Sequence, residues 1–375
     1  MSPPPSFTVE YLELVQVDAE PLPEEFSSSR LRRSLFALAA VVLLVAAAVV
    51  LVPGLSSLRS RFAGAQPGWL ALAAVLQLGS CAAYVLVFRG VFCRRMSWRT
   101  SSEIGLSELA ANSVFSVGGA GGLALGAWIL RRGGLPAAFI ARRTVAFFLL
   151  TSLANVSFLA LGGVALATGI LSGSPGLLLG LIPAVAAALG IALALGARRL
   201  AGLLARRSMR GKLIAAASAV GDGVGEALRL LRTGDPAIFA GAAGYMLFDV
   251  AMLGVCFAAF GNDVPPAGVL LVAYIIGQLG SLIPIPGGIG GVDGGLIGTL
   301  VVYGVDASDA AVAVLAYRGL LLAIPALLGL PALAVLRRRL RDEAHDIAAC
   351  APGETVNVLG RGVVRRPEPV VRAGG

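Results

Sequence analysis

The sequence predicts an all-α polytopic membrane protein with about six full transmembrane helices and two opposed re-entrant half-helix hairpins. Hydrophobic residues make up 57% of the 375 residues and charged residues 14%, whereas about a quarter of the residues in a soluble domain are charged. The mean hydropathy is +0.86, and six apolar segments have the length of a membrane span. A soluble globule, a disordered chain and a coiled coil are therefore excluded.

The six apolar segments are long enough to cross a hydrocarbon core about 30 Å thick, which takes roughly 20 residues. Pro53-Gly54 ends the first segment, and Asp235-Pro236 caps the fifth. Proline residues predict kinks in the last segment. In chain order the predicted spans are 35–52, 69–88, 145–168, 176–196, 237–260 and 310–336.

Two further pairs of apolar stretches are too short to cross the membrane and are separated by glycine-rich turns. Residues 104–115 and 123–130 flank the first turn, and residues 269–283 and 296–303 flank the second. We predict that each pair forms a re-entrant hairpin whose turn lies at membrane depth. Glycine adopts backbone angles closed to other residues, although close helix packing also favours small residues. The turn glycines are Gly118, Gly119, Gly121, Gly122, Gly287, Gly288, Gly290 and Gly291.

Polar segments and one basic loop surround a single membrane domain, residues 34–341. Residues 1–33 and 342–375 are predicted to be disordered cytoplasmic tails. Between the fourth and fifth spans, residues 198–235 carry apolar side chains at helical spacing with basic side chains among them. This pattern predicts a cytoplasmic amphipathic loop on the inner leaflet.

The basic residues predict how the chain is oriented. With the N-terminus inside and hairpins that return to the side they left, all but three of the 30 Lys and Arg residues face the cytoplasm. Arg59 and Arg61 fall outside, and Arg318 lies within the membrane. This asymmetry places both termini in the cytoplasm, and we expect a multi-pass protein of the bacterial plasma membrane.

The two predicted hairpins enter from opposite faces and resemble each other in sequence. Each has a Gly-Gly-x-Gly-Gly turn, and an Ala-rich segment with an arginine follows it: Arg143 after the first and Arg318 after the second. Interrupted helices at corresponding places in two inverted halves mark the midplane site of a transporter. The pattern therefore favours an inverted repeat.

Other functional classes lack the residues that they need. The net charge of +9 comes from arginines beside apolar segments, which indicates membrane flanks and not a nucleic-acid partner. The four cysteines form no Cys-x-x-Cys pair, and His345 is the single histidine. The sequence therefore predicts no disulfide framework, metal site or catalytic triad. It contains no P-loop, and we expect no cofactor and no catalytic residue.

The second turn carries the most specific motif of the chain. Residues 284–293 read Pro-Ile-Pro-Gly-Gly-Ile-Gly-Gly-Val-Asp, and Tyr317-Arg318 follows downstream. This order resembles the transmembrane family found in lysylphosphatidylglycerol synthases, often called flippase-like. Asp293 stands at the acidic position of that family, where glutamate is more usual.

Asn112 and the turn at 118–122 resemble the first motif of the same family. The chain departs from the pattern at Leu123 and Ala124, where polar residues often follow the turn. The resemblance covers roughly residues 35–340 and implies lipid handling rather than aminoacylation. Full synthases add a large soluble domain that uses charged tRNA, and we expect that domain to be absent because a short tail follows the last span.

Asp293, Arg318 and Asp249 each have a functional and a structural interpretation, because a charge inside the membrane costs roughly 2.5–3.5 kcal/mol on insertion scales. Asp293 either receives a headgroup or a coupling ion, or caps the next half-helix and pairs with Arg318. Arg318 either holds a lipid phosphate in a bidentate manner, or neutralises Asp293 or Asp249. For Asp249, structural pairing and transport are both open.

The remaining candidate residues lie on or after the first hairpin, or beside Arg318. Glu108 is on the first half-helix, as a functional carboxyl group or a snorkelling surface residue. Arg143 is an inner-leaflet anchor or the counterpart of Arg318. Asn112 and Tyr317 join the candidate substrate-binding set through the resemblance.

Three classes of function stay open. The leading one is a lipid translocase that moves an anionic or glycosylated polar lipid between leaflets, downhill or coupled to an ion through Asp293 or Glu108. The second is a membrane-embedded lipid or polyprenyl-phosphate transferase. The third is a non-catalytic subunit of a lipid- or glycan-modifying complex. The expected partners are membrane lipids and, for the third class, a lipid-modifying enzyme or a glycosyltransferase.

Overall fold

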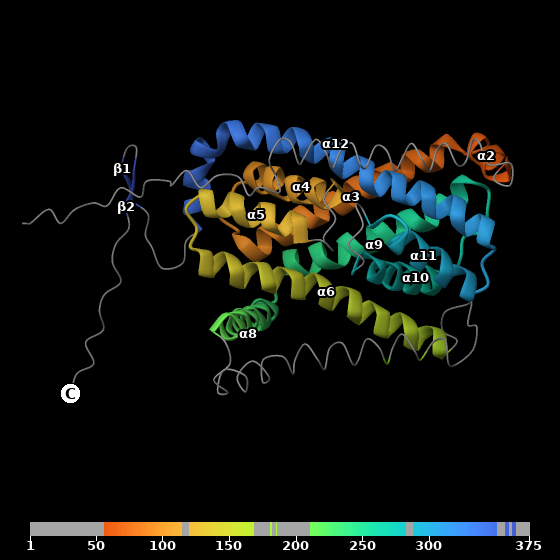
Figure 1. Ribbon diagram of the computed structural model, residues 1–375, viewed down its shortest axis with the longest axis horizontal. Coiled ribbons are helices and arrows are strands. Elements are labelled where there is room, and N and C mark those ends of the chain that lie inside the picture. Colours follow the sequence, from red (N-terminus) through yellow and green to blue (C-terminus); the bar gives the residue numbers. More distant parts are fainter. Residues whose placement is uncertain are drawn as a thin grey trace, which may run out of the picture.

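The computed structural model describes residues 56–114, 120–168, 181, 185, 211–282, 288–350, 357–359 and 362–364. Nearly all of this part of the chain is helical (Figure 1). Two short strands, β1 (Asn357–Leu359) and β2 (Gly362–Val364), pair antiparallel. The predicted first span and nearly all of the fourth lie outside the described residues, as do Gly118, Gly119 and Gly287.

The described helices are α2 (Ser56–Ala63), α3 (Pro67–Phe92), α4 (Trp98–Val114), α5 (Ala120–Arg132), α6 (Ala137–Ala167), α8 (Gly211–Arg232), α9 (Pro236–Ala259), α10 (Ala267–Leu279), α11 (Gly291–Val302) and α12 (Ala307–Ala348). A 3-10 turn, Gly280–Leu282, follows α10.

Four of these helices, α3, α6, α9 and α12, are long and apolar enough to cross a membrane. They confirm the predicted spans 69–88, 145–168, 237–260 and 310–336, and they make the chain a multi-pass membrane protein. Each of the helices α3 and α9 begins with a proline at its first position, and the Asp235 side chain accepts a hydrogen bond from Ala237 N at 3.0 Å. Both features reduce the number of backbone N–H groups that are left without an acceptor in the first turn of a helix.

Two helix boundaries differ most from the predicted ones. Helix α6 begins at Ala137, ahead of the predicted span, because Arg142 and Arg143 continue the helix instead of flanking it. Helix α12 runs on to Ala348, past the expected start of the tail at 342. Arginine, leucine, alanine and glutamate are good helix formers, and the segment after Leu336 contains neither glycine nor proline before the helix ends.

Helices α3 and α9 cross at the centre of the bundle in antiparallel directions. A Cβ atom on Gly241 would lie 2.6 Å from Val87 N and 2.9 Å from Ala83 O. The backbones therefore approach so closely that only glycine fits at this position, as small residues allow in membrane helix pairs. Buried apolar side chains such as Phe88 and Phe257 form the core on either side of this crossing.

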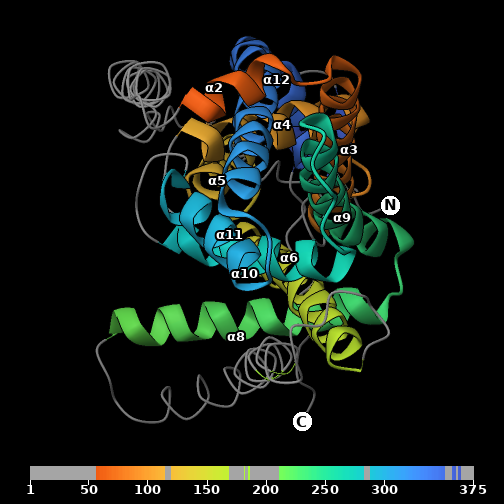
Figure 2. The ribbon, with the colours of Figure 1, turned by 90° about the vertical axis from the view of Figure 1, so that its right-hand side faces the viewer.

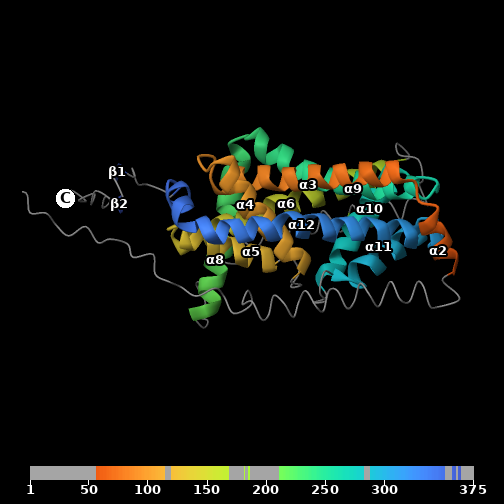
Figure 3. The same cartoon turned by 90° about the horizontal axis from the view of Figure 1, so that it is seen from above.

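Two pairs of short helices lie beside the long ones, at opposite ends of the bundle. Figures 1 and 3 show α4 and α5 along one half of α12, and α10 and α11 along the other half. A Cβ atom on Gly329 would lie 2.0 Å from Leu106 O, which fixes α4 against the second half of α12. A Cβ atom on Gly280 would lie 2.2 Å from the Gly291 backbone, so the end of α10 touches the start of α11.

The helices α3 to α6 and α9 to α12 follow the same plan. The later helices start 169, 169, 171 and 170 residues after α3, α4, α5 and α6 respectively. The connections also match, because Gly134 after α5 and Gly304 after α11 both have a positive φ. In each, the next residue donates to a carbonyl five residues back, Leu135 to Leu130 and Val305 to Leu300, which is a Schellman helix end.

One end of the bundle joins α3 to α4, α5 to α6 and α8 to α9, and includes the end of α12 (Figure 1). The arginines in these segments gather there, and Arg94 pairs with Asp235 at 2.8 Å. Helix α8 runs across this end, roughly perpendicular to the long helices (Figure 2). It buries Val224, Ala227 and Leu230, so the predicted segment 198–235 contains an amphipathic helix over the part that the structure describes.

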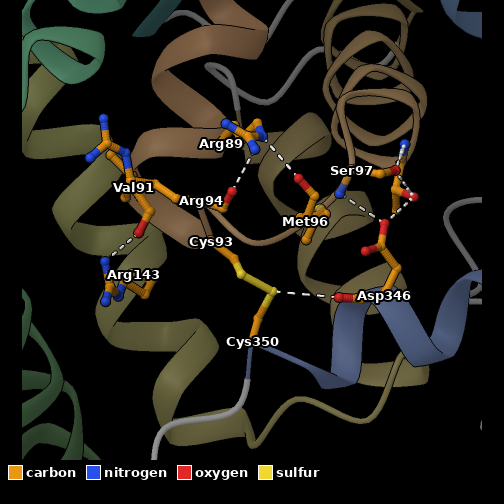
Figure 4. Close-up of a disulfide and its surroundings, with 10 residues drawn as sticks. Arg89, Val91, Cys93, Arg94, Met96, Ser97, Arg143, Asp346 and Cys350 are labelled. Carbon is orange, nitrogen blue, oxygen red and sulfur yellow. Dashed lines mark hydrogen bonds between the residues drawn. A yellow bond between two sulfur atoms is a disulfide. The ribbon is translucent and has the colours of Figure 1, made fainter.

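A disulfide joins Cys93, after α3, to Cys350, after α12, with the Cα atoms 5.6 Å apart. The sequence predicted no disulfide framework, and this single cross-link corrects that expectation. The two cysteines are separated by 257 residues, so only the fold reveals that they meet. Beside them, Asp346 accepts hydrogen bonds from Ser97 N at 2.9 Å and Thr100 Oγ1 at 2.7 Å, which fastens the end of α12 to the start of α4 (Figure 4).

Candidate functional site

Asp293 and Arg318 form a nearly buried ion pair between α11 and α12. Arg318 Nε donates to Asp293 Oδ1 at 2.8 Å, and the side chains are 9% and 15% exposed. The expectation that the two residues lie close enough to interact is confirmed. Because the two side chains are nearly buried, each charge compensates the other, and either charge alone would be costly to bury.

The second glycine turn lies directly over this ion pair. Gly288 and Gly290 have φ values of +64° and +86°, which only glycine adopts readily. A Cβ atom on Gly288 would lie 3.4 Å from Arg318 Nη2. Asp293 Oδ2 accepts a hydrogen bond from Gly290 N at 2.7 Å, so one carboxylate holds both the turn and the arginine. Gly290 and Gly294 are exposed, so the backbone at the start of α11 is accessible beside the pair.

The first pair of short helices holds its own buried polar residues. Asn112 Oδ1 accepts a hydrogen bond from Gly122 N at 2.7 Å, which caps the start of α5 from α4. Glu108 is 1% exposed, and Tyr84 of α3 donates to its Oε2 at 2.7 Å. Gly121 and Gly122 are buried here. Glu108 is thus an interior carboxyl group, and the snorkelling interpretation is wrong.

Glycine makes room for Glu108 between the helices. A Cβ atom on Gly126 of α5 would lie 1.5 Å from Glu108 Oε1, which no side chain could accommodate without moving α5 or the carboxyl group. The sequence analysis included Glu108 but gave no role to Gly126 or Tyr84. Neither belongs to a motif, and only the packing of α3, α4 and α5 shows that they surround the carboxyl group.

Asp249 lies in the middle of α9 with its carboxyl group fully buried. Tyr274 of α10 donates to Asp249 Oδ2 at 3.0 Å. Tyr317 of α12, next to Arg318 in sequence, is fully buried and within electrostatic range of the same carboxyl group. The expected ion pair of Asp249 with Arg318 is not formed, because Arg318 faces Asp293 on α11 while Tyr317 faces α9.

Arg143 does not occupy the position that the repeat in sequence suggested. It pairs with Glu226 of α8 at 3.1 Å and donates to the carbonyl of Val91. It is the seventh residue of α6, whereas Arg318 is the twelfth residue of α12. Arg143 therefore fastens α8 to the bundle at the arginine-rich end, and the interpretation as the counterpart of Arg318 is wrong. An alanine-rich context alone could not fix its register.

The structure divides the candidate residues into neighbouring groups. Arg318, Asp293 and the described glycines of the second turn form one group, and Asp249 with Tyr317 lies beside it. Glu108, Asn112 and Gly122 form a separate group at the first pair of short helices.

The family comparison matches most of this architecture. The family model described as Lysylphosphatidylglycerol synthase TM region matches residues 36–329. This range contains α3, α6, α9 and both pairs of short helices, and it includes α12 as far as Gly329. No curated protein matches the chain. The match confirms the resemblance carried by the turn at 284–293 and by Tyr317-Arg318. The chain therefore belongs to the family of the lysylphosphatidylglycerol synthase transmembrane region, which indicates a membrane lipid-related function.

Proposed function

We propose that this chain is a lipid translocase that moves an anionic or glycosylated polar lipid between the two leaflets. The observation that carries the proposal is the Asp293–Arg318 ion pair beneath the glycine turn. A guanidinium group presents a planar fork that matches two phosphate oxygens. The start of α11 adds backbone N–H groups and the positive end of a helix dipole.

The ion pair supports exchange of one anion for another. Asp293 pairs with Arg318 and accepts a hydrogen bond from the Gly290 amide. An arriving phosphate would compete for the same donors and offer equivalent acceptors, so the buried cation would stay compensated throughout. The accessible backbone at Gly290 and Gly294 is where a headgroup would approach, with the acyl chains remaining in the bilayer.

The matching plan of α3–α6 and α9–α12 supports alternating access. We infer that the two sets are inverted repeats and that α4–α5 and α10–α11 are re-entrant hairpins entering from opposite leaflets. Short helix pairs at opposite ends of the bundle fit this inference, as do helix starts offset by about 170 residues. Rocking of one set against the other would expose the site to each leaflet in turn.

Reconstitution of the purified chain tests the proposal. Proteoliposomes that carry a headgroup-labelled anionic lipid in one leaflet should lose the asymmetry faster than protein-free vesicles, with no donor substrate added. A matched preparation with Arg318→Lys controls for bilayer leakiness, because it keeps the positive charge of the site but loses the guanidinium fork. Equal rates for the wild-type chain and empty vesicles would contradict translocation. Product formation that requires an added donor would identify a transferase instead.

A further inference from the structure

We propose that Asp249 is a proton-binding site, and that Tyr317 links its protonation to the Arg318–Asp293 pair. The inference rests on the proposed function for its role in transport, but not for the proton itself. Asp249 is 1% exposed and lies one helix away from the ion pair. Among the residues that the structure describes, no arginine or lysine forms an ion pair with it.

Three buried oxygen atoms around Asp249 have no hydrogen-bond partner. They are Asp249 Oδ1 itself, Tyr317 Oη of α12 and Gln77 Oε1 of α3. Ser80 also faces the carboxyl group, and its hydroxyl group lies 3.3 Å from the carbonyl oxygen of Tyr245, an alternative acceptor for its one proton. A buried carboxylate oxygen without a donor is costly, because burial removes its water. Protonation turns the same oxygen into a donor.

The unpartnered groups are compatible with both the protonated and the ionised form of the Asp249 carboxyl group. When Asp249 is protonated, it gains a hydrogen that it can donate, and Tyr317 Oη, within electrostatic range, is an unpartnered acceptor. When it is ionised, Tyr317 can donate its hydroxyl proton to the carboxylate. Tyr274 donates to the other oxygen in either state. Because Tyr317 Oη and Asp249 Oδ1 have no hydrogen-bond partner in this structure, a closer approach of the two groups together with rotation of the Tyr317 hydroxyl group accommodates the arrival and departure of a proton.

Among the residues that the structure describes, the groups around Asp249 are hydroxyl, thiol and amide groups rather than opposite charges. Helix α3 presents Gln77, Ser80 and Cys81, and α9 adds Tyr245. Helix α10 presents Tyr274, and α12 presents Tyr317. Helix α6 carries no titratable side chain beyond Arg143. With no cation at the carboxyl group, a proton is the positive charge that the site itself can take up and release.

Tyr317 connects this site to the ion pair because it precedes Arg318 on α12. Tyr317 faces Asp249 of α9, and Arg318 faces Asp293 of α11. A shift of α12 that separates Arg318 from Asp293 must also move the Tyr317 hydroxyl relative to Asp249. Anion exchange at Arg318 and proton exchange at Asp249 are therefore coupled reciprocally.

Infrared spectroscopy of the purified chain in lipid nanodiscs tests the proton site without any transport. A protonated buried carboxyl group gives its own carbonyl stretching band, which Asp249→Asn should remove in part. Tyr317→Phe should shift the frequency of that component, since it loses its hydrogen-bond partner. Glu108→Gln is the matched control for the other buried carboxyl group and should leave the Asp249 component in place. An unchanged band in Asp249→Asn would overturn the proposal.

Proteoliposomes with a pH gradient test the link to lipid movement. The measured quantity is the ratio of labelled-lipid transport rates with and without the gradient, whatever the basal rate of each variant. This ratio should differ from one in the wild-type chain and fall to one in Asp249→Asn, while Asp222→Asn, which changes an exposed carboxyl group on α8, keeps the wild-type ratio. A wild-type ratio of one, or a retained response in Asp249→Asn, would overturn the coupling. If no variant transports lipid, the proposed function fails and the infrared result alone decides the proton site.

Discussion

The buried charged residues of this chain fall into two kinds that differ in their partners. Asp293 and Arg318 compensate each other directly. Glu108 and Asp249 form no ion pair among the described residues, and each accepts a hydrogen bond from a tyrosine hydroxyl group, Tyr84 for the first and Tyr274 for the second. A hydroxyl bond offsets less of the cost of burying a carboxylate than a cation does. Removing one partner therefore has different consequences in the two settings.

Arg318→Lys should reduce lipid transport about 10- to 100-fold although the charge is kept. The lysine loses the fork that can hold two phosphate oxygens, and one charge-assisted hydrogen bond is worth about 1.5–3 kcal/mol. The proteoliposome assay measures this loss directly. Transport at the wild-type rate would show that Arg318 acts as a point charge and not as a phosphate ligand.

Loss of one partner of the ion pair should destabilise the fold more than loss of both. Arg318→Leu or Asp293→Leu leaves one buried charge unpaired, which costs about 3–5 kcal/mol, whereas the double change removes both charges. Thermal unfolding in detergent should therefore show recovery in the double variant. Its transport should stay absent, and normal transport by the double variant would leave only a structural role for the pair.

Gly126→Ala should destabilise the first pair of short helices by about 1–3 kcal/mol, the usual cost of overpacking. The new Cβ atom would overlap Glu108 Oε1, so Glu108→Ala in the same chain should restore part of the loss. Gly298→Ala on the exposed side of α11 is the control, because nothing lies within 4 Å of its Cβ position. Equal melting temperatures for the two single variants would contradict this account.

At the scale of the helices, the sequence predicted the features that depend only on residues within one segment. Apolar length predicted α3, α6, α9 and α12, and the clustered glycines predicted the break before α11, because these signals lie within one segment. The partner of Arg143 could not be predicted, since Glu226 is on a separate helix. The same holds for Gly126 and for the Cys93–Cys350 pair. Each depends on how distant helices pack, which no single segment encodes.

The end of α12 should detach from α4 as the pH falls. Burial raises the pKa of Asp346, whereas hydrogen bonds from Thr100 and Ser97 lower it. The hydrogen bonds together outweigh burial, so the net pKa is below its usual value. A depressed carboxyl pKa adds stability above the unfolded value of about 3.9, and that stability is lost as the pH falls through the folded pKa. Hydrogen exchange at 343–348, measured relative to the intrinsic exchange rate at each pH, should therefore quicken in acid under reducing conditions. In Asp346→Asn it should be fast already at neutral pH, and an equal pH response in both would contradict the latch.

At the scale of the whole molecule, the two ends of the bundle differ in charge and in architecture. One end has the transverse helix α8, many arginines and the Cys93–Cys350 pair. The other joins Arg61 of α2 to Asp309 of α12. The positive-inside rule places the arginine-rich end in the cytoplasm. Disulfides, in contrast, persist mainly in oxidising compartments, so charge and cysteine pairing point in opposite directions.

Single-cysteine labelling in a cysteine-free chain should resolve the orientation. Asp222 on α8 and Asp263 after α9 are both exposed and lie at opposite ends. In intact cells an impermeant maleimide should modify Asp263→Cys at once and Asp222→Cys only after permeabilisation. The reverse pattern would place the arginine-rich end outside and overturn the cytoplasmic termini.

With the arginine-rich end in the cytoplasm, Cys93 and Cys350 should be thiols in growing cells. The cytosolic thiol pool keeps such pairs reduced, while the Cα separation of 5.6 Å lies within the range that a disulfide spans. A permeant alkylating reagent should therefore modify both thiols before lysis, and an added oxidant should close the pair and block modification. Cys350→Ser should leave Cys93 reactive in both conditions. A disulfide already formed in untreated cells would mean that this end of the bundle faces an oxidising compartment. In that case the impermeant maleimide should label Asp222→Cys in intact cells without permeabilisation.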